Sequence, residues 1–149
     1  DGATDGASTE ASVTVREPVY ARYWRLRQTT SVYLHAPRTG EVAFFSGSTE
    51  LTVTSSMMTS SFSSVSSPIP YGATNNCVDS GWIWSSGDSL VVDFGKAVAM
   101  DEVRLYHVYG GGRRAAEWEV ASSDDGSTWE TQSTLDYDAD GCGWYDFSW

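Results

Sequence analysis

The sequence predicts an all-β domain, and three observations support this. Several stretches alternate apolar and polar residues with a period of two, the pattern of strands that bury one face. Turn residues, mainly Gly, Asp and Ser, separate these stretches at short intervals. No long stretch repeats apolar residues at the helical period between capping signals. Many short strands in one chain form an antiparallel sandwich or a barrel.

The first part of the chain divides into a leader and the start of the domain. Residues 1–17 show little periodicity and are predicted to be a flexible leader, whereas residues 18–149 suit one domain with a single core. Residues 20–30 (YARYWRLRQTT) alternate and predict a first strand, and residues 40–48 (GEVAFFSGS) predict a second. Residues 51–56 (LTVTSS) alternate in the same way, which predicts a third strand.

A serine-rich segment runs from Ser55 to Pro70, a composition typical of linkers. Apolar side chains interrupt the serines, so we expect part of this segment to pack against the domain; they are Met57, Met58, Phe62 and Val65. Beyond it, β-like runs predict four further strands, at SLVVDFG (89–95), EVRLYHVYG (102–110), EWEVASS (117–123) and TWETQSTL (128–135).

The net charge of the chain limits the classes of partner that we expect it to bind. The formal net charge is −11, from nine Lys and Arg residues against twenty Asp and Glu residues. Nucleic acids and anionic membranes are bound by clustered cations, so the charge argues against both as partners. An acidic surface that is poor in lysine and rich in serine, threonine and glycine favours an extracellular setting. We therefore expect a secreted or cell-surface protein.

Two cysteines, Cys77 and Cys142, lie far apart, without a CxxC motif or a companion pair of histidines, which argues against a zinc site. The favoured interpretation is a disulfide bond, and the alternative is two unrelated buried thiols. In the chain-entropy model, a disulfide that closes a loop of this length would stabilise the fold by about 4 kcal/mol.

Segments in the second half of the chain resemble the discoidin, or F5/8 type C, domain family. They are ATNNCVDSGWIWSS (73–86), SLVVDFGKAVAMDEVRLYHV (89–108) and AEWEVASSDDGSTWE (116–130). The most specific parts are VDFG at 92–95 and SSDDGSTWE at 122–130, where Gly126 at positive φ would close a tight hairpin and Trp129 could fold back over the sheet. The resemblance covers about residues 51–149. It implies a galactose-binding-like fold, which is a jelly-roll-like antiparallel β-sandwich.

The order of the segments departs from the family pattern. Residues 18–48 correspond to the strands that close the C-terminal end of the family domain, and residues 51–149 correspond to its N-terminal and central part. One interpretation is a circular permutation that closes within the chain, since the termini of such domains lie close together. The other is that these strands pair with a neighbouring copy, or belong to the preceding copy of a tandem array, which would give head-to-tail polymers.

The resemblance implies a non-catalytic module that binds extracellular carbohydrate, as a lectin or adhesion domain. The alternative is a structural repeat or subunit of an extracellular fibre, sheath or adhesin, assembled with neighbouring copies by strand exchange. The residues also argue against an enzyme, because neither His35 nor His107 stands in a nucleophile motif and no phosphate loop is present. Acidic neighbours such as Asp101 and Glu102 are expected to be surface charges rather than a glycosidase pair.

A structural Ca²⁺ is a further implication of the resemblance, because many family members bind one. Asp79 matches the aspartate of the family site and Glu41 matches its glutamate. Both supply the oxygen ligands that this hard cation prefers. The threonine of the family site is missing, and Ile83 stands in its place. The alternative is that Asp79 only caps a turn with its carboxylate.

Loops at one end of the sandwich form the ligand site in family lectins, so aromatic and basic residues near glycines are the predicted ligand-binding residues. The loop HVYGGGRRAAEW and the segments GWIW and GCGWYDFSW supply them: His107, Tyr109, Arg113, Arg114, Trp82, Trp144 and Tyr145. Aromatic faces can stack on sugar rings, and loop aromatics are more exposed than those in strands. The alternatives are that Arg114 pairs with carboxylates and that several tryptophans are core residues; these are Trp82, Trp84, Trp118 and Trp129.

Overall fold

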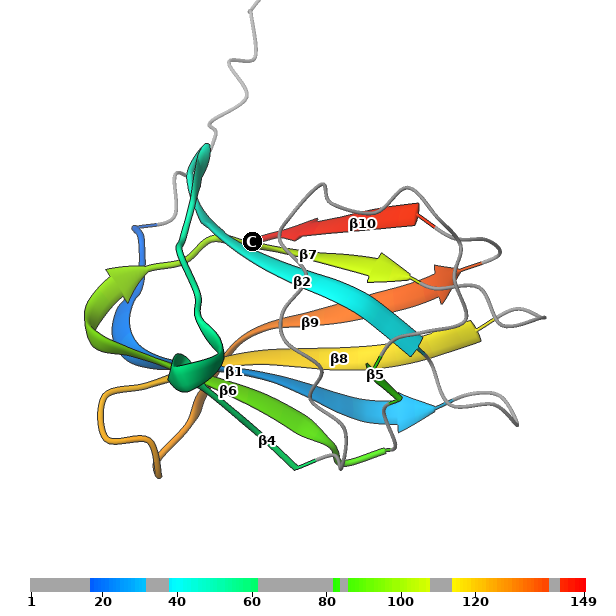
Figure 1. The fold of residues 1–149 in the computed structure, drawn as a ribbon, viewed down its shortest axis with the longest axis horizontal. Helices are drawn as coiled ribbons and strands as arrows, with labels where there is room; N and C mark the ends of the chain where they lie inside the picture. The colour runs from blue at the N-terminus through cyan, green and yellow to red at the C-terminus, as the bar shows by residue number, and fades with distance from the viewer. Residues whose placement is uncertain (1–16, 32–37, 62–81, 84–85, 108–113, 140–142) are drawn as a thin grey trace, which may run out of the picture.

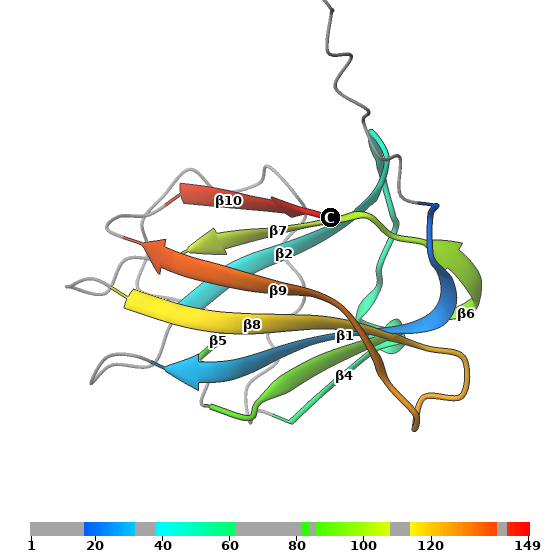
Figure 2. The ribbon, with the colours of Figure 1, turned by 180° about the vertical axis from the view of Figure 1, so that it is seen from behind.

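The computed structural model describes residues 17–31, 38–61, 82–83, 86–107, 114–139 and 143–149 (Figure 1). These residues form two antiparallel sheets that face each other, seen from opposite sides in Figures 1 and 2. The predicted all-β sandwich is therefore confirmed. Within the described part of the chain, no helix is long and apolar enough to cross a membrane.

The first sheet has the strand order β4–β6–β1–β8–β9. Its strands are β4 (Met58–Ser60), β6 (Ser89–Ala99), β1 (Tyr20–Ser31), β8 (Arg114–Ser123) and β9 (Glu130–Ala139). The central strand, β1, alternates as its sequence predicts: Trp24 and Leu26 are buried, whereas Arg27 is exposed. The same alternation in β8 buries Trp118, as expected of a core tryptophan.

The second sheet has the order β10–β7–β2–β3, and a further short strand, β5, pairs with β2. Its strands are β10 (Gly143–Ser148), β7 (Glu102–His107), β2 (Arg38–Ser46), β3 (Thr49–Glu50) and β5 (Trp82–Ile83). Both sheets contribute to one hydrophobic core. The largest apolar side chains that are fully buried in it are Trp24, Trp118, Leu26, Leu90, Met100 and Leu105. Each aliphatic one contributes about 1.5–3 kcal/mol through burial.

Residues 51–56 differ from the prediction, because they form no strand. The chain has no regular element over 51–54 and then makes a 3-10 turn, η1 (Ser55–Met57). Burial alternates nonetheless, since Leu51 and Val53 pack against the core while Thr52 and Thr54 are exposed. The period of two therefore predicted correctly which side chains are buried. A strand also needs a neighbouring strand with which it can pair along its length.

The start of the serine-rich segment packs as expected, because Met57 and Met58 lie against the core. Met58 opens β4, which pairs with β6 at the edge of the first sheet. Phe62 and Val65, the other two apolar residues of this segment, lie outside the described residues.

The early strands lie inside the sheets rather than beside them. β1 pairs with β6 on one side and β8 on the other, and β2 pairs with β7. The residues that resemble the C-terminal strands of the family thus complete both sheets of this chain. Exchange between copies would use the same strand pairs, so closure within the chain and strand exchange both remain predictions.

Candidate functional site

One end of the sandwich, which we call the loop end, is where β7 ends and where β2, β8 and β10 begin (Figure 1). Thr39 pairs there with both Trp82 and His107, and His107 also pairs with Gly143. The structure thereby brings the backbones of Trp82 and His107, two predicted ligand residues, to a shared position. Arg114 pairs with Ala139 in the other sheet.

Five of the predicted site residues lie outside the described part of the chain. They are Tyr109 and Arg113 of the ligand set, Asp79 of the metal set, and both members of the predicted disulfide, Cys77 and Cys142. Their roles stay predictions.

Trp144 and Tyr145 lie in strand β10, so the expectation that both stand in a glycine-rich loop is wrong. The run from Gly143 pairs residue by residue with β7, and the alternation of a strand sends the two rings to opposite faces. Tyr145 packs against the core, while the Trp144 ring meets the Tyr106 ring edge-on, with centroids 5.2 Å apart at 62°. Trp82 likewise lies in a strand, β5, rather than in a turn.

Glu41 lies in β2, directly across from Tyr106. Its side chain is 1% exposed, and neither carboxylate oxygen has a hydrogen-bond partner within the described residues. Burial, together with repulsion from Glu50, raises the pKa of Glu41 to about 7. Within the same residues, no three potential metal ligands cluster together. Glu41 is therefore a buried carboxyl group whose charged form lacks compensation in the part of the chain that the structure describes.

The acidic neighbours Asp101 and Glu102 have structural contacts. Both carboxylate oxygens of Asp101 accept the Gly47 N–H at 2.9 Å. Glu102 pairs with Arg104, whose guanidinium also lies 3.6 Å from Asp146 and over the ring of Phe45. Each of the two acids thus has a structural partner, and the expectation that they are not a catalytic pair stays a prediction.

The opposite end of the sandwich carries the β8–β9 turn (Figures 1 and 2), which we call the turn end. Asp125 organises this turn: its Oδ1 accepts the N–H groups of Ser127 and Thr128 at 2.8 and 2.7 Å. The hydroxyls of Ser123 and Thr128 donate to the same carboxylate. These donors, the backbone N–H groups first, hold the pKa of Asp125 well below its usual range. Gly126 has φ +73°, which confirms the predicted glycine turn.

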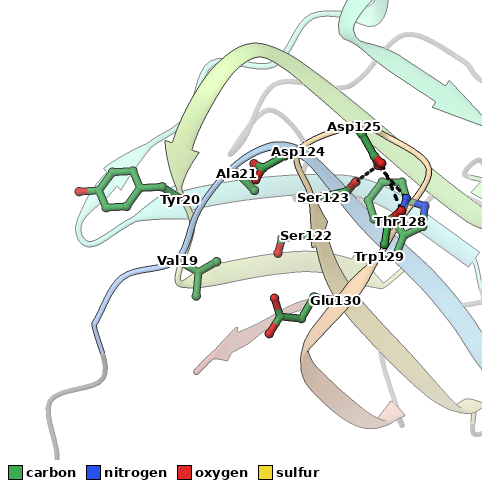
Figure 3. A pocket seen from close by; sticks show the side chains of 10 residues that line it. All are labelled: Val19, Tyr20, Ala21, Ser122, Ser123, Asp124, Asp125, Thr128, Trp129 and Glu130. Carbon is green, nitrogen blue, oxygen red and sulfur yellow. Dashed lines mark hydrogen bonds between the residues drawn. The ribbon is translucent and has the colours of Figure 1, made fainter.

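A pocket of about 330 Å³ opens between this turn and the beginning of β1. Figure 3 shows its lining, which comprises Val19, Tyr20, Ala21, Ser122, Ser123, Asp124, Asp125, Thr128, Trp129 and Glu130. Asp124 and Glu130 are exposed at its edge, and Tyr20, at 63% exposure, is the most exposed large hydrophobic residue described. No Lys, Arg or His lines the pocket. It is thus an acidic, partly apolar opening.

Trp129 also borders this pocket, and it is not part of the core. Its ring lies under the guanidinium of Arg25, with 4.5 Å from the Arg25 Cζ to the ring centroid. Arg25 in turn donates a hydrogen bond of 2.8 Å to Glu119. The predicted folding of Trp129 back over the sheet is therefore confirmed, whereas the expectation that it is a core residue is wrong.

The sequence did not reveal this pocket. Its turn was predicted from SSDDGSTW, but the other wall comes from residues about a hundred positions earlier, Val19–Ala21. Only the pairing of β1 with β8 brings the two walls together, at Tyr23 with Ser123. A local sequence pattern cannot predict a long-range contact of this kind.

The two sheets define the class of protein, which is an antiparallel β-sandwich. The family model for the F5/8 type C domain matches residues 52–143, more than half of the chain. The chain belongs to the F5/8 type C domain family. Domains of this family are typically non-catalytic modules that bind carbohydrates or other ligands. In the same comparisons, no curated protein and no solved structure matched.

Proposed function

We propose that this chain is an extracellular, non-catalytic glycan-binding module whose site lies at the loop end. The observation that carries the proposal is the convergence of predicted ligand residues there. The backbones of His107 and Trp82 meet at Thr39, and Trp144 lies half-buried beside Tyr106 on the strand that pairs with β7. An aromatic ring held by a neighbouring ring offers a preorganised surface for the C–H face of a sugar.

The basic and polar residues of the β7–β8 segment complete the proposed site. Arg113 and Arg114 would donate hydrogen bonds to sugar hydroxyls in a planar fork, and His107 and Tyr109 would add single polar contacts. Because a module of this kind only binds, its residues need no matched acid and base.

A test of this site compares Arg113→Ala and Trp144→Ala with Arg27→Ala on a glycan array. Arg27 is an exposed arginine in the middle of β1 and matches the charge change of Arg113→Ala. We expect both loop-end variants to lose binding. Arg113→Ala should keep the melting temperature of the parent, whereas Trp144→Ala should lower it modestly because its ring packs against Tyr106. Binding that survives both substitutions would contradict the site.

Ca²⁺ is the proposed structural ion, held by Glu41 together with Asp79. The described part of the site fits such an ion, because Glu41 is buried and both of its oxygens lack partners there. A carboxylate in that position is stabilised by a hard cation that takes oxygen ligands. The ion would supply the positive charge that this carboxylate lacks, and it would fix the start of β2 at the loop end.

Thermal unfolding in CaCl₂ and in EDTA tests the ion. Binding to the folded state alone raises the melting temperature by mass action. We expect CaCl₂ to raise it for the parent chain and to leave Glu41→Gln unchanged. An equal rise in the melting temperature of both proteins would show that Glu41 is not a ligand of the ion.

The second candidate function is a structural subunit that assembles head-to-tail by strand exchange. The observation that favours it is the position of β1, which fills the centre of the first sheet although it precedes the residues matched by the family model. A strand in that position would bind tightly to another copy if it were donated.

A further inference from the structure

We propose that the pocket at the turn end binds the side chain of a lysine or arginine presented by a partner polypeptide. The pocket is lined by the β8–β9 turn. This turn lies at the opposite end of the sandwich from the end of β7 and the beginning of β8, where the glycan site is proposed (Figures 1 and 2). The inference is therefore independent of the proposed function. Three features of the pocket carry it: its charge, its supply of hydrogen-bond acceptors and its apolar wall.

The charge of the pocket is uncompensated within the described residues. Asp124 and Glu130 are both exposed, and no cationic group contacts either carboxylate there. The carboxylates of Asp93 and Glu119 on the same sheet, by contrast, each bind an arginine at 2.8 Å. Figure 3 shows Asp124 and Glu130 on either side of Ser122. A cation entering between them would meet two negative charges in a chain of net charge −11.

The hydrogen-bonding groups of the turn are largely committed to one another. The Ser123 hydroxyl donates to Asp125 and accepts from the Gly126 N–H, and the Thr128 hydroxyl donates to Asp125. Ser122 accepts a hydrogen bond of 2.9 Å from the amide of Gln132. What remains at the edge is mainly the acceptor oxygens of Asp124 and Glu130. The complementary ligand must therefore be rich in donors, and ammonium and guanidinium groups are donors only.

The wall formed by the start of β1 favours a ligand with an apolar stem behind its charged group. Val19 and Ala21 line it with aliphatic surface. Tyr20 belongs to the same wall, although its exposed ring points away from Asp124 and Glu130 (Figure 3). Lysine and arginine lay their methylene stems along apolar surface while the charged head reaches polar groups. A volume of about 330 Å³ is at the small end of ligand pockets and suits one side chain rather than a folded surface.

The test is an NMR titration of the ¹⁵N-labelled chain with the peptide acetyl-Gly-Lys-Gly-amide, observed at the Gly126 amide and the Trp129 indole N–H. The matched peptide acetyl-Gly-norleucine-Gly-amide keeps the stem and lacks the charge. We expect saturable shifts with the lysine peptide, weakened by added salt, and much smaller shifts with the norleucine peptide. Equal shifts with both peptides, or none with either, would overturn the proposal.

Two single-charge variants locate the binding. Glu130→Gln should lower the affinity for the lysine peptide by about two- to fivefold, which is the effect expected from the loss of a partly exposed ion pair. Asp136→Asn removes an equal charge from the same strand outside the pocket and should leave the affinity unchanged. Equal effects of the two variants would reduce the binding to general attraction and contradict a site. If n-butylammonium binds with the same affinity as the lysine peptide, the pocket is a site for small amines. That result would contradict a polypeptide partner.

Discussion

At the scale of single residues, Glu41 makes the stability of the fold depend on pH. Its carboxyl group is buried in β2, and the charged form has no donor within the described residues. Burial and the charge of Glu50 together raise the pKa of Glu41 from 4.5 to about 7. In the absence of a cation the folded state therefore favours the protonated carboxyl group, and a bound cation would favour the carboxylate instead.

The pH dependence of unfolding in EDTA follows from this shift. The raised pKa means that the folded state binds the Glu41 proton more tightly than the unfolded state. The contribution of Glu41 is therefore fully present below pH 4.5 and is lost as pH rises towards about 7. The loss amounts to at most about 3 kcal/mol. Urea unfolding across this range should show a smaller fall for Glu41→Gln than for the parent, and identical profiles would contradict the shift.

Two tryptophans that the sequence treats alike have different roles in the structure. Trp118 is 0% exposed in the core, whereas Trp129 lies under Arg25 outside it. Trp118→Ala should lower the free energy of unfolding by about 3–5 kcal/mol. Trp129→Ala should cost about 1–2 kcal/mol, because it loses mainly a cation–π contact and part of its burial. Chemical denaturation of both variants measures this, and equal costs would place Trp129 in the core after all.

Composition alone cannot separate these tryptophans. Trp118 alternates with Glu117 and Glu119 in the middle of β8, so its direction is fixed by the period of the strand. Trp129 comes at the end of a turn, immediately before β9, where no such period applies. Its position depends instead on Arg25 of β1, which the sequence places far away.

At the scale of elements, the β8–β9 turn depends on one glycine. Gly126 has φ +73°, and a Cβ there would lie 3.3 Å from the ring of Tyr23. Gly126→Ala should therefore lower stability by about 1–2 kcal/mol for the left-handed conformation, and by more if the Tyr23 ring cannot move. Gly143→Ala is the matched control, since a Cβ at Gly143 meets no atom within 4 Å. Equal melting temperatures for the two variants would contradict this account of the turn.

The strands were predictable where the alternation is long and the strand has partners. β1, β6 and β8 each contain a stretch of alternating apolar residues, and sequence reasoning located these three strands as well as β9. Residues 51–56 alternate too, yet within the described residues one backbone hydrogen bond ties them to a neighbouring strand: the Leu51 N–H donates to the Phe44 carbonyl at 2.8 Å. In β10 the glycines suggested a loop, but pairing with β7 overrode that local signal.

At the scale of the whole molecule, the question is how the chain closes its sheets. β1 contributes the central strand of one sheet and β2 joins the middle of the other, so neither sheet is complete without residues that precede the family match. We expect closure within the chain and hence a monomer of 16.2 kDa in size-exclusion chromatography with light scattering. Integer multiples of this mass that persist on dilution would favour strand exchange instead.

Of the two candidate sites, the sequence predicted the one at the loop end but not the pocket at the turn end. The loop end was predicted because the resemblance assigned its residues, and the structure brings the backbones of His107 and Trp82 together there. Their role in binding stays a prediction. The turn-end pocket was not predicted, because it needs the start of β1 and the turn after β8 together. Its acids, Asp124 and Glu130, gave no local signal in a chain with twenty acidic residues.

The central claim is that this F5/8 type C domain binds glycans, and a glycan-array screen of the purified chain in CaCl₂, repeated in EDTA, tests it most directly. We predict reproducible binding to one class of sugar, with loss of signal in EDTA if the Glu41 ion shapes the loop end. A folded chain that binds no glycan under either condition would contradict the claim and favour the structural, strand-exchanging subunit.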